Sequence, residues 1–503
     1  MKSRTTFCFA LLAVGFLLAW LPLVLSPFTF PAWDEVFQVM ESAHRLVFGY
    51  GMVSWEFDYG ARSWALGAVA ALPLGVARHL GQGPEFYVPL IWATFSLGAA
   101  GVILCVGLWA ERFYGRLGGL AAAIAAASWI DNLYFGGRAL SEVVSVHLLI
   151  GSVWLAEPGY RVENRARLMT AGFLAAIACV LRLQLGPAAL LLWLWPWRDQ
   201  RRLLLLSAGA VIALVLDGAF DLLAWSYPFE PLWRNAAFNL WLGGGDAFGT
   251  APVWGYFPEL WFRWGVSLVP FLGLAALGAR RLPLLAAMSL LTFAVHAVIP
   301  HKEYRFLLPA IMMASVLWGL GLVEATGWLA GLLRARMGER ARLLAASLMG
   351  LLWLGLSGGN VLTPNSDPRW SADTTSVLET TLAISRLPAI CGVGYANMFP
   401  WYSGGYTFLH RPVPMYFSVQ QDNFFQSQKA YDVLVLRRED MDYYRATPLL
   451  DGYTLLQCYR DHCVWRRQGG CSDIRTSPPR LGELNAELSH DPRYPYAEGI
   501  PRK

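Results

Sequence analysis

Long apolar runs without charge constrain the fold of this chain more than any other feature. The first run extends from Phe7 to Ser26 and follows Lys2 and Arg4. A helix that crosses a bilayer needs about 20 such residues. A cleaved signal peptide has a shorter apolar core and a small-x-small cleavage site, and no Ala-x-Ala follows this run. The sequence therefore predicts a retained first transmembrane helix, with its N-terminus in the cytoplasm.

Nine further apolar runs follow, and short basic loops separate them. The runs lie at roughly 87–109, 117–132, 139–156, 168–197 (a pair broken at Gly186-Pro187), 203–225, 263–279, 283–299, 306–328 and 343–358. Basic residues concentrate in cytoplasmic loops of membrane proteins. The basic loops all fall on one side of the membrane if 27–86 is one long extracytoplasmic loop in which 63–80 lies at the membrane interface. About eleven spans result, with the C-terminus outside. The residues assigned to the cytoplasmic side are Arg112, Arg116, Arg161, Arg165, Arg167, Arg198, Arg201, Arg202, Arg280, Arg281 and the run from Arg334 to Arg342.

Composition agrees with a polytopic α-helical membrane protein and excludes several other classes. Of the 503 residues 56% are hydrophobic and 15% are charged, with a mean hydropathy of +0.40. A soluble protein is about one quarter charged. A net charge of +5 is too small for binding a nucleic-acid backbone. These values exclude a cytosolic enzyme, a disordered regulator and a nucleic-acid-binding protein.

The composition changes after Gly358, which predicts a membrane domain over 1–358 and a C-terminal domain over 359–503. The second region carries polar residues at ordinary soluble frequencies. Its short apolar runs at Ala389–Val393, Tyr431–Leu436 and Tyr453–Leu456 are typical of strands. We expect a small extracytoplasmic α/β domain that ends in a polar tail after Cys471.

The cysteines fall into two groups. Cys8, Cys105 and Cys179 lie in apolar runs, where a free cysteine acts as a small buried hydrophobe. The other four lie in the C-terminal domain, where an oxidising compartment permits one or two disulfides. Sequence alone leaves the pairing open. A metal site with His462 is disfavoured because the spacing matches no compact ligand pattern. These four are Cys391, Cys458, Cys463 and Cys471.

Ionisable residues gather at the predicted extracytoplasmic ends of the helices. Asp34 and Glu35 directly follow the first helix, where they could supply a general base or cap a short helix. Asp217 and Asp221 are four apart and share one helix face, as do Arg138 and Glu142, which could form an ion pair. Ionisable groups within membrane segments are costly and point to function, although those near helix ends can reach the interface.

Two basic positions suggest either interfacial anchors or binding of an anionic lipid group. Arg182 interrupts an apolar run near its outer end. His301-Lys302-Glu303-Tyr304-Arg305 fills a tight turn between two apolar runs. Cations are disfavoured in extracytoplasmic loops, so this cluster indicates an anionic partner such as a lipid phosphate.

These segments resemble the family 22 mannosyltransferases of the GT-C superfamily, which build asparagine-linked glycan precursors and GPI anchors. The resemblance covers roughly residues 1–360, and its motifs occur in the family's order. His301-Lys302-Glu303-Tyr304-Arg305-Phe306 is similar to the family's His-Lys-Glu-x-Arg-Phe signature. The other matching residues are Asp34-Glu35-Val-Phe-Gln38, Gly49-Tyr50-Gly51, Trp55-Glu56, Arg62-Ser63, Arg138-Ala-Leu-Ser-Glu142, Asp217, Phe238-Asn239 and Gly249-Thr250-Ala-Pro252-Val-Trp254-Gly-Tyr256.

The resemblance implies an enzyme that moves mannose from a polyprenyl (dolichyl-type) phosphate to a glycan or glycolipid acceptor, with inversion at the anomeric carbon. It implies Asp34 as the general base, supported by Glu35. The implied donor-phosphate ligands are His301, Lys302, Arg305, Arg138 and Arg182. Further substrate contacts are expected from Gln38, Trp55, Glu56, Arg62, Asp217, Asp221, Glu303 and Tyr256.

The lipid-linked sugar acts as a co-substrate, so we expect no cofactor and no metal. The enzyme would work at the extracytoplasmic face of a bacterial plasma membrane, or of the endoplasmic reticulum in a eukaryote. One alternative is a GT-C transferase of another polyprenyl-phosphate sugar, of the aminoarabinose or protein O-mannosyl type. A transporter is less favoured, because transporters carry ionisable groups near the bilayer midplane and contain internal repeats.

Overall fold

The computed structural model of this chain describes residues 3–25, 29–30, 32–157, 164–195, 199–338, 340–362, 372–418, 424 and 426–473. Arg161, Arg198 and the predicted polar tail beyond 473 lie outside the described residues. The chain divides into two compact units. The helical unit comprises Met1–Leu25, Trp92–Leu232 and Ala236–Asp367, and the loop–sheet unit comprises Ser26–Ile91, Trp233–Asn235 and Pro368–Lys503.

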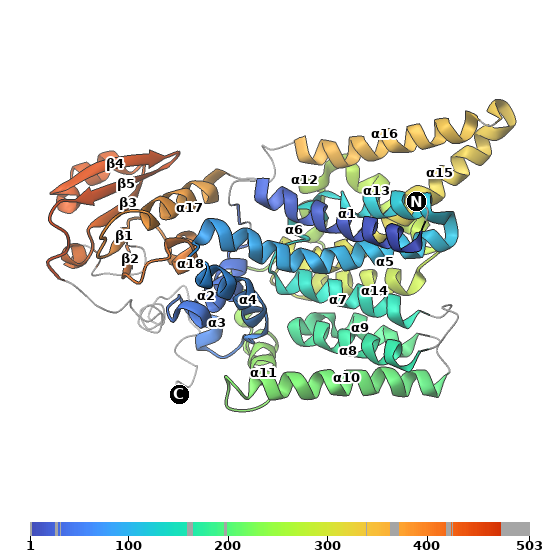
Figure 1. Ribbon diagram of the computed structural model, residues 1–503, viewed down its shortest axis with the longest axis horizontal. Coiled ribbons are helices and arrows are strands. Elements are labelled where there is room, and N and C mark those ends of the chain that lie inside the picture. Colours follow the sequence, from blue (N-terminus) through green and yellow to red (C-terminus); the bar gives the residue numbers. More distant parts are fainter. Residues whose placement is uncertain are drawn as a thin grey trace. The chain divides into compact units, whose positions relative to one another are not determined.

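Helices packed side by side make up the helical unit (Figure 1). Among the described residues, six helices are long and apolar enough to cross a membrane, and four shorter helices are also apolar. The predicted polytopic helical class is confirmed, whereas the count of about eleven spans stays a prediction. The helices wholly or mainly in this unit are α1 (Arg4–Leu25), α5 (Pro84–Ala127), α6 (Ile130–Phe135), α7 (Ser141–Ala156), α8 (Arg165–Leu181), α9 (Gly186–Leu194), α10 (Gln200–Asp221), α11 (Glu230–Ala236), α12 (Tyr256–Trp264), α13 (Leu268–Ala279), α14 (Pro283–Val298), α15 (Leu308–Met337) and α16 (Arg340–Leu362).

Two predicted helix boundaries depend on local backbone geometry. The runs at 87–109 and 117–132 meet inside α5 at Gly115, whose φ of 72° is accessible to glycine at little cost. The break predicted at Gly186-Pro187 lies earlier, at the extended residue Arg182 and a 3-10 turn over Leu183–Leu185. Pro187 instead occupies the first turn of α9, where its fixed φ and missing N–H are tolerated.

Small residues allow the helices to approach closely. A Cβ added at Gly209 of α10 would lie 1.8 Å from the Met169 carbonyl oxygen of α8, and one at Gly172 would lie 1.9 Å from the Leu206 oxygen. Backbone contact at small residues is a common basis of helix association in membranes. The α8–α10 pair is therefore specified by two glycines.

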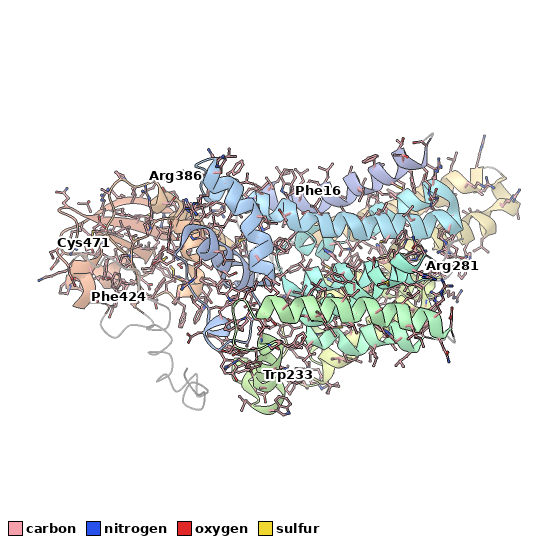
Figure 2. All side chains as sticks on the ribbon, turned by 60° about the horizontal axis from the view of Figure 1, so that its bottom comes forward. Phe16, Trp233, Arg281, Arg386, Phe424 and Cys471 are labelled. Carbon is pink, nitrogen blue, oxygen red and sulfur yellow. A yellow bond between two sulfur atoms is a disulfide. The ribbon has the colours of Figure 1, made fainter. Side chains whose placement is uncertain are left out.

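Several of the predicted cytoplasmic arginines form contacts at one end of the helical unit, near Gly115 within α5 and the last turn of α7. Arg112 pairs with Glu157 at 3.1 Å, and Arg281 pairs with Glu324 at 2.8 Å and stacks over Phe113. Figure 2 labels Arg281 at this end of the unit. The structure thus brings together basic residues that the sequence assigns to one side.

The first loop contributes short helices to the loop–sheet unit. A π-helix, η1 (Glu35–Met40), continues into α2 (Glu41–Phe48), and α3 (Trp55–Asp58) and α4 (Ala65–His79) follow. Helix α4 packs against α2 and η1 and exposes Leu72 and Val76. This exposed apolar side is what an interfacial helix requires.

The C-terminal residues form the predicted α/β fold. One five-stranded sheet has the order β2-β1-β3-β5-β4, with β1 parallel to β2 and β3, and β5 antiparallel to β3 and β4 (Figure 1). Helix α17 (Ala372–Ser385) packs on β4 and β5. The predicted runs at 431–436 and 453–456 overlap β3 and β4, whereas the run at 389–393 ends on the first residue of β1, and β2 and β5 were not predicted. The strands are β1 (Val393–Tyr395), β2 (Met415–Phe417), β3 (Val433–Arg437), β4 (Tyr453–Tyr459) and β5 (His462–Arg467).

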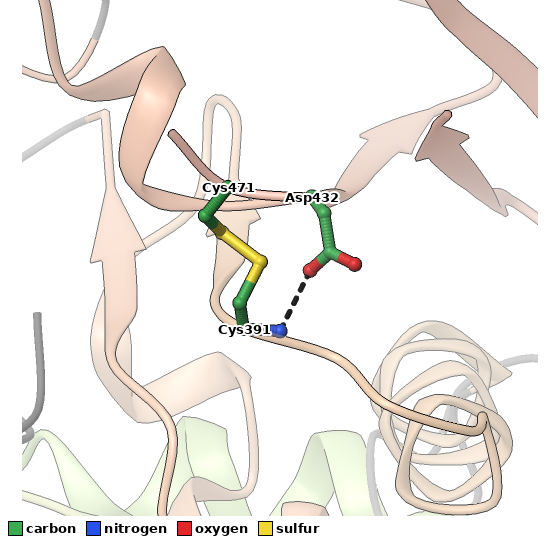
Figure 3. A group of neighbouring side chains, drawn as sticks. All are labelled: Cys391, Asp432 and Cys471. Atoms are coloured by element: carbon green, nitrogen blue, oxygen red, sulfur yellow. Dashed lines mark hydrogen bonds between the residues drawn. A yellow bond between two sulfur atoms is a disulfide. The ribbon is translucent and has the colours of Figure 1, made fainter. Parts of the chain in front are cut away.

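Two disulfides close the sheet region. Cys458 and Cys463 are bonded across the β4–β5 hairpin, where they face each other in register. Cys391 and Cys471 are also bonded, and the Cys391 N–H donates to Asp432 Oδ1 at 2.9 Å (Figure 3). The sulfur atoms of this last pair are bonded to each other, so they are not free thiolates for a metal.

Candidate active site: a loop carboxylate and a basic network

The acidic pair of the first loop lies where the chain enters the π-helix η1. Asp34 occupies the N-cap position but makes no capping hydrogen bond, so the structure does not support capping as its role. Glu35 is fully buried, whereas Asp34 remains partly exposed. π-Helical turns are rare and often occur at functional sites. The exposure difference makes Asp34 the member of the pair that a substrate can reach.

Gln38 connects Asp34 to a second carboxylate. Its Nε2 donates to Asp34 Oδ1 and to Glu56 Oε1, the latter at 2.7 Å. Gln38 and Glu56 are each 7% exposed, so this bridge is shielded from water. The predicted residues Asp34, Gln38 and Glu56 are therefore brought together, and the amide fixes the direction in which the Asp34 carboxylate points. Trp55 opens α3 directly before Glu56, and Arg62 lies four residues beyond the end of α3.

The predicted basic residues form a connected network in the helical unit. Arg182 pairs with Glu142 Oε1 at 2.8 Å, and Arg305 reaches the same oxygen at 3.7 Å. Arg305 also binds Glu303 through two hydrogen bonds of 2.6 and 3.0 Å. Residues from the start of α7, the α8–α9 break and the 301–305 turn thus meet around Glu142, which is 1% exposed.

His301 completes this network. Its Nε2 lies 3.0 Å from Glu303 Oε1, and its Nδ1 lies 2.9 Å from the Gly249 carbonyl oxygen. The hydrogen bond to Glu303 raises the pKa of His301. Burial alone would raise the pKa of Glu303, but His301 and Arg305 outweigh it and hold that pKa well below its usual range. Glu303 is therefore ionised, and His301 binds its proton more tightly than a free imidazole does.

Lys302 and Arg138 occupy structural positions beside the network. Lys302 Nζ donates to the carbonyls of Ala297 (2.8 Å) and Ile299 (2.6 Å) at the end of α14, and lies 5.4 Å from the centre of the Tyr256 ring. Burial lowers its pKa. Arg138 is 1% exposed and lies over the ring of Tyr134 at 4.4 Å.

The network and the two cations beside it together carry an excess of positive charge. Within the network Arg182 and Arg305 balance Glu142 and Glu303 when His301 is neutral, so the excess comes from Arg138 and Lys302. Arginine is well suited to bidentate phosphate binding. The structure therefore offers residual positive charge for an anion, which the anchor interpretation alone would not require. The cations are Arg138, Arg182, Lys302 and Arg305, and the carboxylates are Glu142 and Glu303.

Asp217 and Asp221 lie together on the last turns of α10. They are 7% and 2% exposed, and Asp217 Oδ2 has no hydrogen-bond partner among the described residues. The predicted shared face is therefore present, while their role as substrate ligands stays a prediction.

Glu41 was not predicted to be a site residue, and it links the first loop to the C-terminal residues. Its carboxylate accepts from the Met52 N–H at 2.6 Å, and from the N–H and the hydroxyl of Thr407, the latter at 2.6 Å. Burial raises the pKa of Glu41 to about 7. Nearby, His44 Nε2 lies 3.1 Å from His410 Nδ1. No sequence pattern connects residues that are more than 360 positions apart.

Helices of membrane-spanning length, followed by a small C-terminal sheet, give this chain a fold of the GT-C type. The same fold occurs in the crystal structure of ArnT from Cupriavidus metallidurans bound to undecaprenyl phosphate. The TM-score is 0.62 at 14% identity, over 95% of this chain and 100% of that one. At this identity the likeness shows the fold alone.

The chain belongs to the Alg9-like mannosyltransferase family, whose model matches residues 7–363. Mannosyltransferase APTG1 of Arabidopsis thaliana is 25% identical over 58% of this chain and 54% of its own length. GPI mannosyltransferase 3 of Yarrowia lipolytica is 28% identical over 55% of each chain. GPI alpha-1,2-mannosyltransferase 3 of Danio rerio is 24% identical over 64% of this chain and 60% of its own. The chain thus spans little more than half of these relatives, and the family predicted from its motifs is confirmed.

Proposed function

We propose that this chain transfers mannose from a polyprenyl-phosphate donor to a hydroxyl group of a glycan or glycolipid acceptor. Asp34 acts as the general base. The observation that carries this proposal is the partly exposed Asp34 carboxylate, oriented by Gln38 at the start of a π-helix. A base must be fixed in direction and accessible to the hydroxyl that it deprotonates.

The reaction is a single displacement. The acceptor oxygen forms a bond to C1 of mannose while the bond from C1 to the phosphate oxygen breaks, and the polyprenyl phosphate leaves with the electron pair. The acceptor proton passes to Asp34. Attack from the face opposite the phosphate inverts the anomeric carbon. The leaving phosphate is already stable, so no strong acid is required.

The basic network supplies the electrostatic part of the proposal. Negative charge grows on the leaving phosphate in the transition state, and preorganised cations stabilise such charge strongly. Arg182 and Arg305 are held in place by Glu142 and Glu303, so little reorganisation is needed. Lys302 uses two of its three donors on α14 carbonyls, which leaves one for an oxygen of the phosphate.

We further propose that the transfer occurs on the extracytoplasmic side. Glu142 lies in the first turn of α7, and Glu157, the partner of Arg112, follows the last residue of the same helix. A helix of 16 residues is roughly 24 Å long. The network thus lies far from the arginines assigned to the cytoplasm. The names of the relatives place a GPI-type glycolipid first among the acceptors to test.

A GT-C transferase of another polyprenyl-phosphate sugar is the second candidate. It is kept as a candidate because ArnT, which shares the fold, is bound to undecaprenyl phosphate in its crystal structure. The segment from His301 to Phe306 and the family membership favour mannose. Offering both donors to the same preparation separates the two candidates.

The deciding experiment measures sugar transfer from polyprenyl phosphate mannose by the detergent-solubilised protein, with GDP-mannose as the control donor. Asp34→Asn keeps the shape of the side chain and should lower turnover by about 10²–10⁴-fold. Asp58→Asn, an exposed acid of the same loop, is the matched control and should retain full turnover. Wild-type protein that ignores the lipid donor with every acceptor, or an active Asp34→Asn protein, contradicts the proposal.

Lys302→Ala tests the phosphate contact separately. The variant should remain folded and should use the donor poorly at low donor concentration. Unchanged turnover under these conditions would show that Lys302 serves only the end of α14.

A further inference from the structure

Aromatic side chains from two distant parts of the chain meet at Trp33, the residue that precedes Asp34. Trp33 contacts Tyr402 edge-to-face, with ring centres 5.7 Å apart and an interplanar angle of 87°. Trp33 also stacks on Phe30, at 6.4 Å and 20°. Both chain segments belong to the loop–sheet unit.

The C-terminal partner is a short aromatic turn, η8 (Pro400–Tyr402). Phe399 and Trp401 stack with ring centres 4.5 Å apart and an interplanar angle of 10°. Tyr402 remains 42% exposed, and Trp33 and Trp401 are half-buried. We name Trp33, Trp401 and Tyr402 the aromatic platform.

The platform is held from beneath by buried groups. Phe30 is 1% exposed and packs edge-to-face on the fully buried Phe408. Ser403 Oγ donates to the Pro400 carbonyl at 2.6 Å, and Thr381 Oγ1 donates to the Ser403 carbonyl at 2.9 Å. A turn fixed in this way keeps its rings in place without burying them completely.

Partly exposed, rigid aromatic rings are suited to a sugar. A pyranose ring offers a face of C–H groups to an aromatic surface, while its hydroxyls remain available for hydrogen bonding. Tyrosine and tryptophan combine an apolar body with a polar edge for this kind of contact. A ring used only for core packing would be buried like Phe408.

We propose that the aromatic platform binds the sugar ring of the acceptor and brings its reactive hydroxyl to Asp34. The inference rests on the proposed function, because it takes Asp34 as the base. Trp33 directly precedes Asp34 in the chain, so the platform lies at the entry to η1, where the proposed base is located. The C-terminal domain thereby helps to select the acceptor, a role that the sequence leaves open.

Steady-state kinetics of Tyr402→Ala and Trp401→Ala test the proposal. Each variant should raise the KM for the acceptor by roughly 2- to 12-fold, the equivalent of a single aromatic contact. The KM for the donor, and donor hydrolysis without acceptor, should be unchanged. Tyr402→Phe keeps the ring and should behave like the wild type. Tyr443→Ala removes a 68% exposed tyrosine elsewhere in the same unit and is the matched control.

A binding measurement separates this proposal from the proposed function. An α-linked mannose disaccharide is titrated into the Asp34→Asn protein, and tryptophan fluorescence reports binding without turnover. Binding that Tyr402→Ala weakens and Tyr443→Ala preserves supports the platform, even if the general base proves to be another residue. Equal binding by both variants overturns it. A rise in the donor KM instead of the acceptor KM also overturns it, because the rings would then contact the lipid-linked donor.

Discussion

Glu41 should make the stability of this protein fall as the pH rises. The burial that raises its pKa to about 7 outweighs the opposing hydrogen bonds from Thr407 and Met52. The ordinary value for a glutamate is 4.5. A carboxyl that holds its proton more tightly when folded stabilises the folded state below the unfolded pKa. That contribution is lost as the pH rises through the folded pKa.

The expected magnitude follows from the size of the shift. Each pKa unit corresponds to about 1.4 kcal/mol. The shift from 4.5 to about 7 should therefore lower the free energy of unfolding by about 3 kcal/mol between pH 5 and pH 9. Glu41→Gln replaces the carboxyl with a neutral group of the same shape. Its amide oxygen can accept from Thr407, but its NH2 group faces the Met52 N–H, which costs about 1 kcal/mol.

The assay is thermal unfolding of the full-length protein in detergent, followed by tryptophan fluorescence at pH 5, 7 and 9. The free energies of unfolding of the wild type and of Glu41→Gln should agree within about 1 kcal/mol at pH 5. The variant should be more stable by about 2 kcal/mol at pH 9. Burial lowers the pKa values of His44 and His410, and both residues are present in the two proteins, so their effects cancel in the difference.

Glu439→Gln provides the matched control, because Glu439 is 70% exposed and pairs with Arg437 at the surface of the same unit. The difference in free energy of unfolding between Glu439→Gln and the wild type should not change with pH. A Glu41→Gln difference that is constant with pH would refute the reasoning. If the wild type instead became more stable relative to the variant as the pH rises, the hydrogen bonds of Glu41 would outweigh its burial.

Three further perturbations should act on stability. Cys391→Ser opens a disulfide with a sequence separation of 80 and should lower the free energy of unfolding by about 4–5 kcal/mol, whereas Cys458→Ser, with a separation of 5, should lower it by about 2 kcal/mol. Chemical denaturation of the oxidised protein measures both values, and equal values would contradict the chain-entropy argument. Gly209→Ala adds a Cβ that clashes with the Met169 carbonyl, so it should disrupt the packing of α8 on α10 and lower the yield of folded protein. A normal yield would mean that the two helices can shift apart easily. Tyr304→Phe removes a hydroxyl that donates to Asp131 at 2.7 Å and should lower the free energy of unfolding by about 1–3 kcal/mol in the same assay. An unchanged free energy would indicate that water replaces the hydroxyl.

The helical class and the composition of the candidate site could be predicted because their signals are local. An apolar run of about 20 residues has few alternatives to a membrane helix. Asp34, Gln38 and Glu56 stood out within 23 residues of the first loop, and the 301–305 cluster stood out as an exception to the positive-inside rule. Whether Asp34 caps a helix or stays accessible was not decided, because that depends on the π-helical turn.

Other features depend on contacts between distant residues. The two disulfide pairings require strand register, and β2 and β5 are too short or too polar to be distinguished from loops by periodicity. Arg182, at the break between α8 and α9, forms an ion pair with Glu142, which belongs to another helix. A single sequence contains no record of such a pair.

Hydrophobicity and short motifs act over a few residues, so they were enough to predict a membrane protein with a small C-terminal α/β region and the motifs of the mannosyltransferase family. The contacts of Glu41 with Thr407 and of Trp33 with Tyr402 became visible only in the folded chain. Such pairs form only when the whole chain folds, because the free energy that joins them comes from packing and buried hydrogen bonds rather than from local preference.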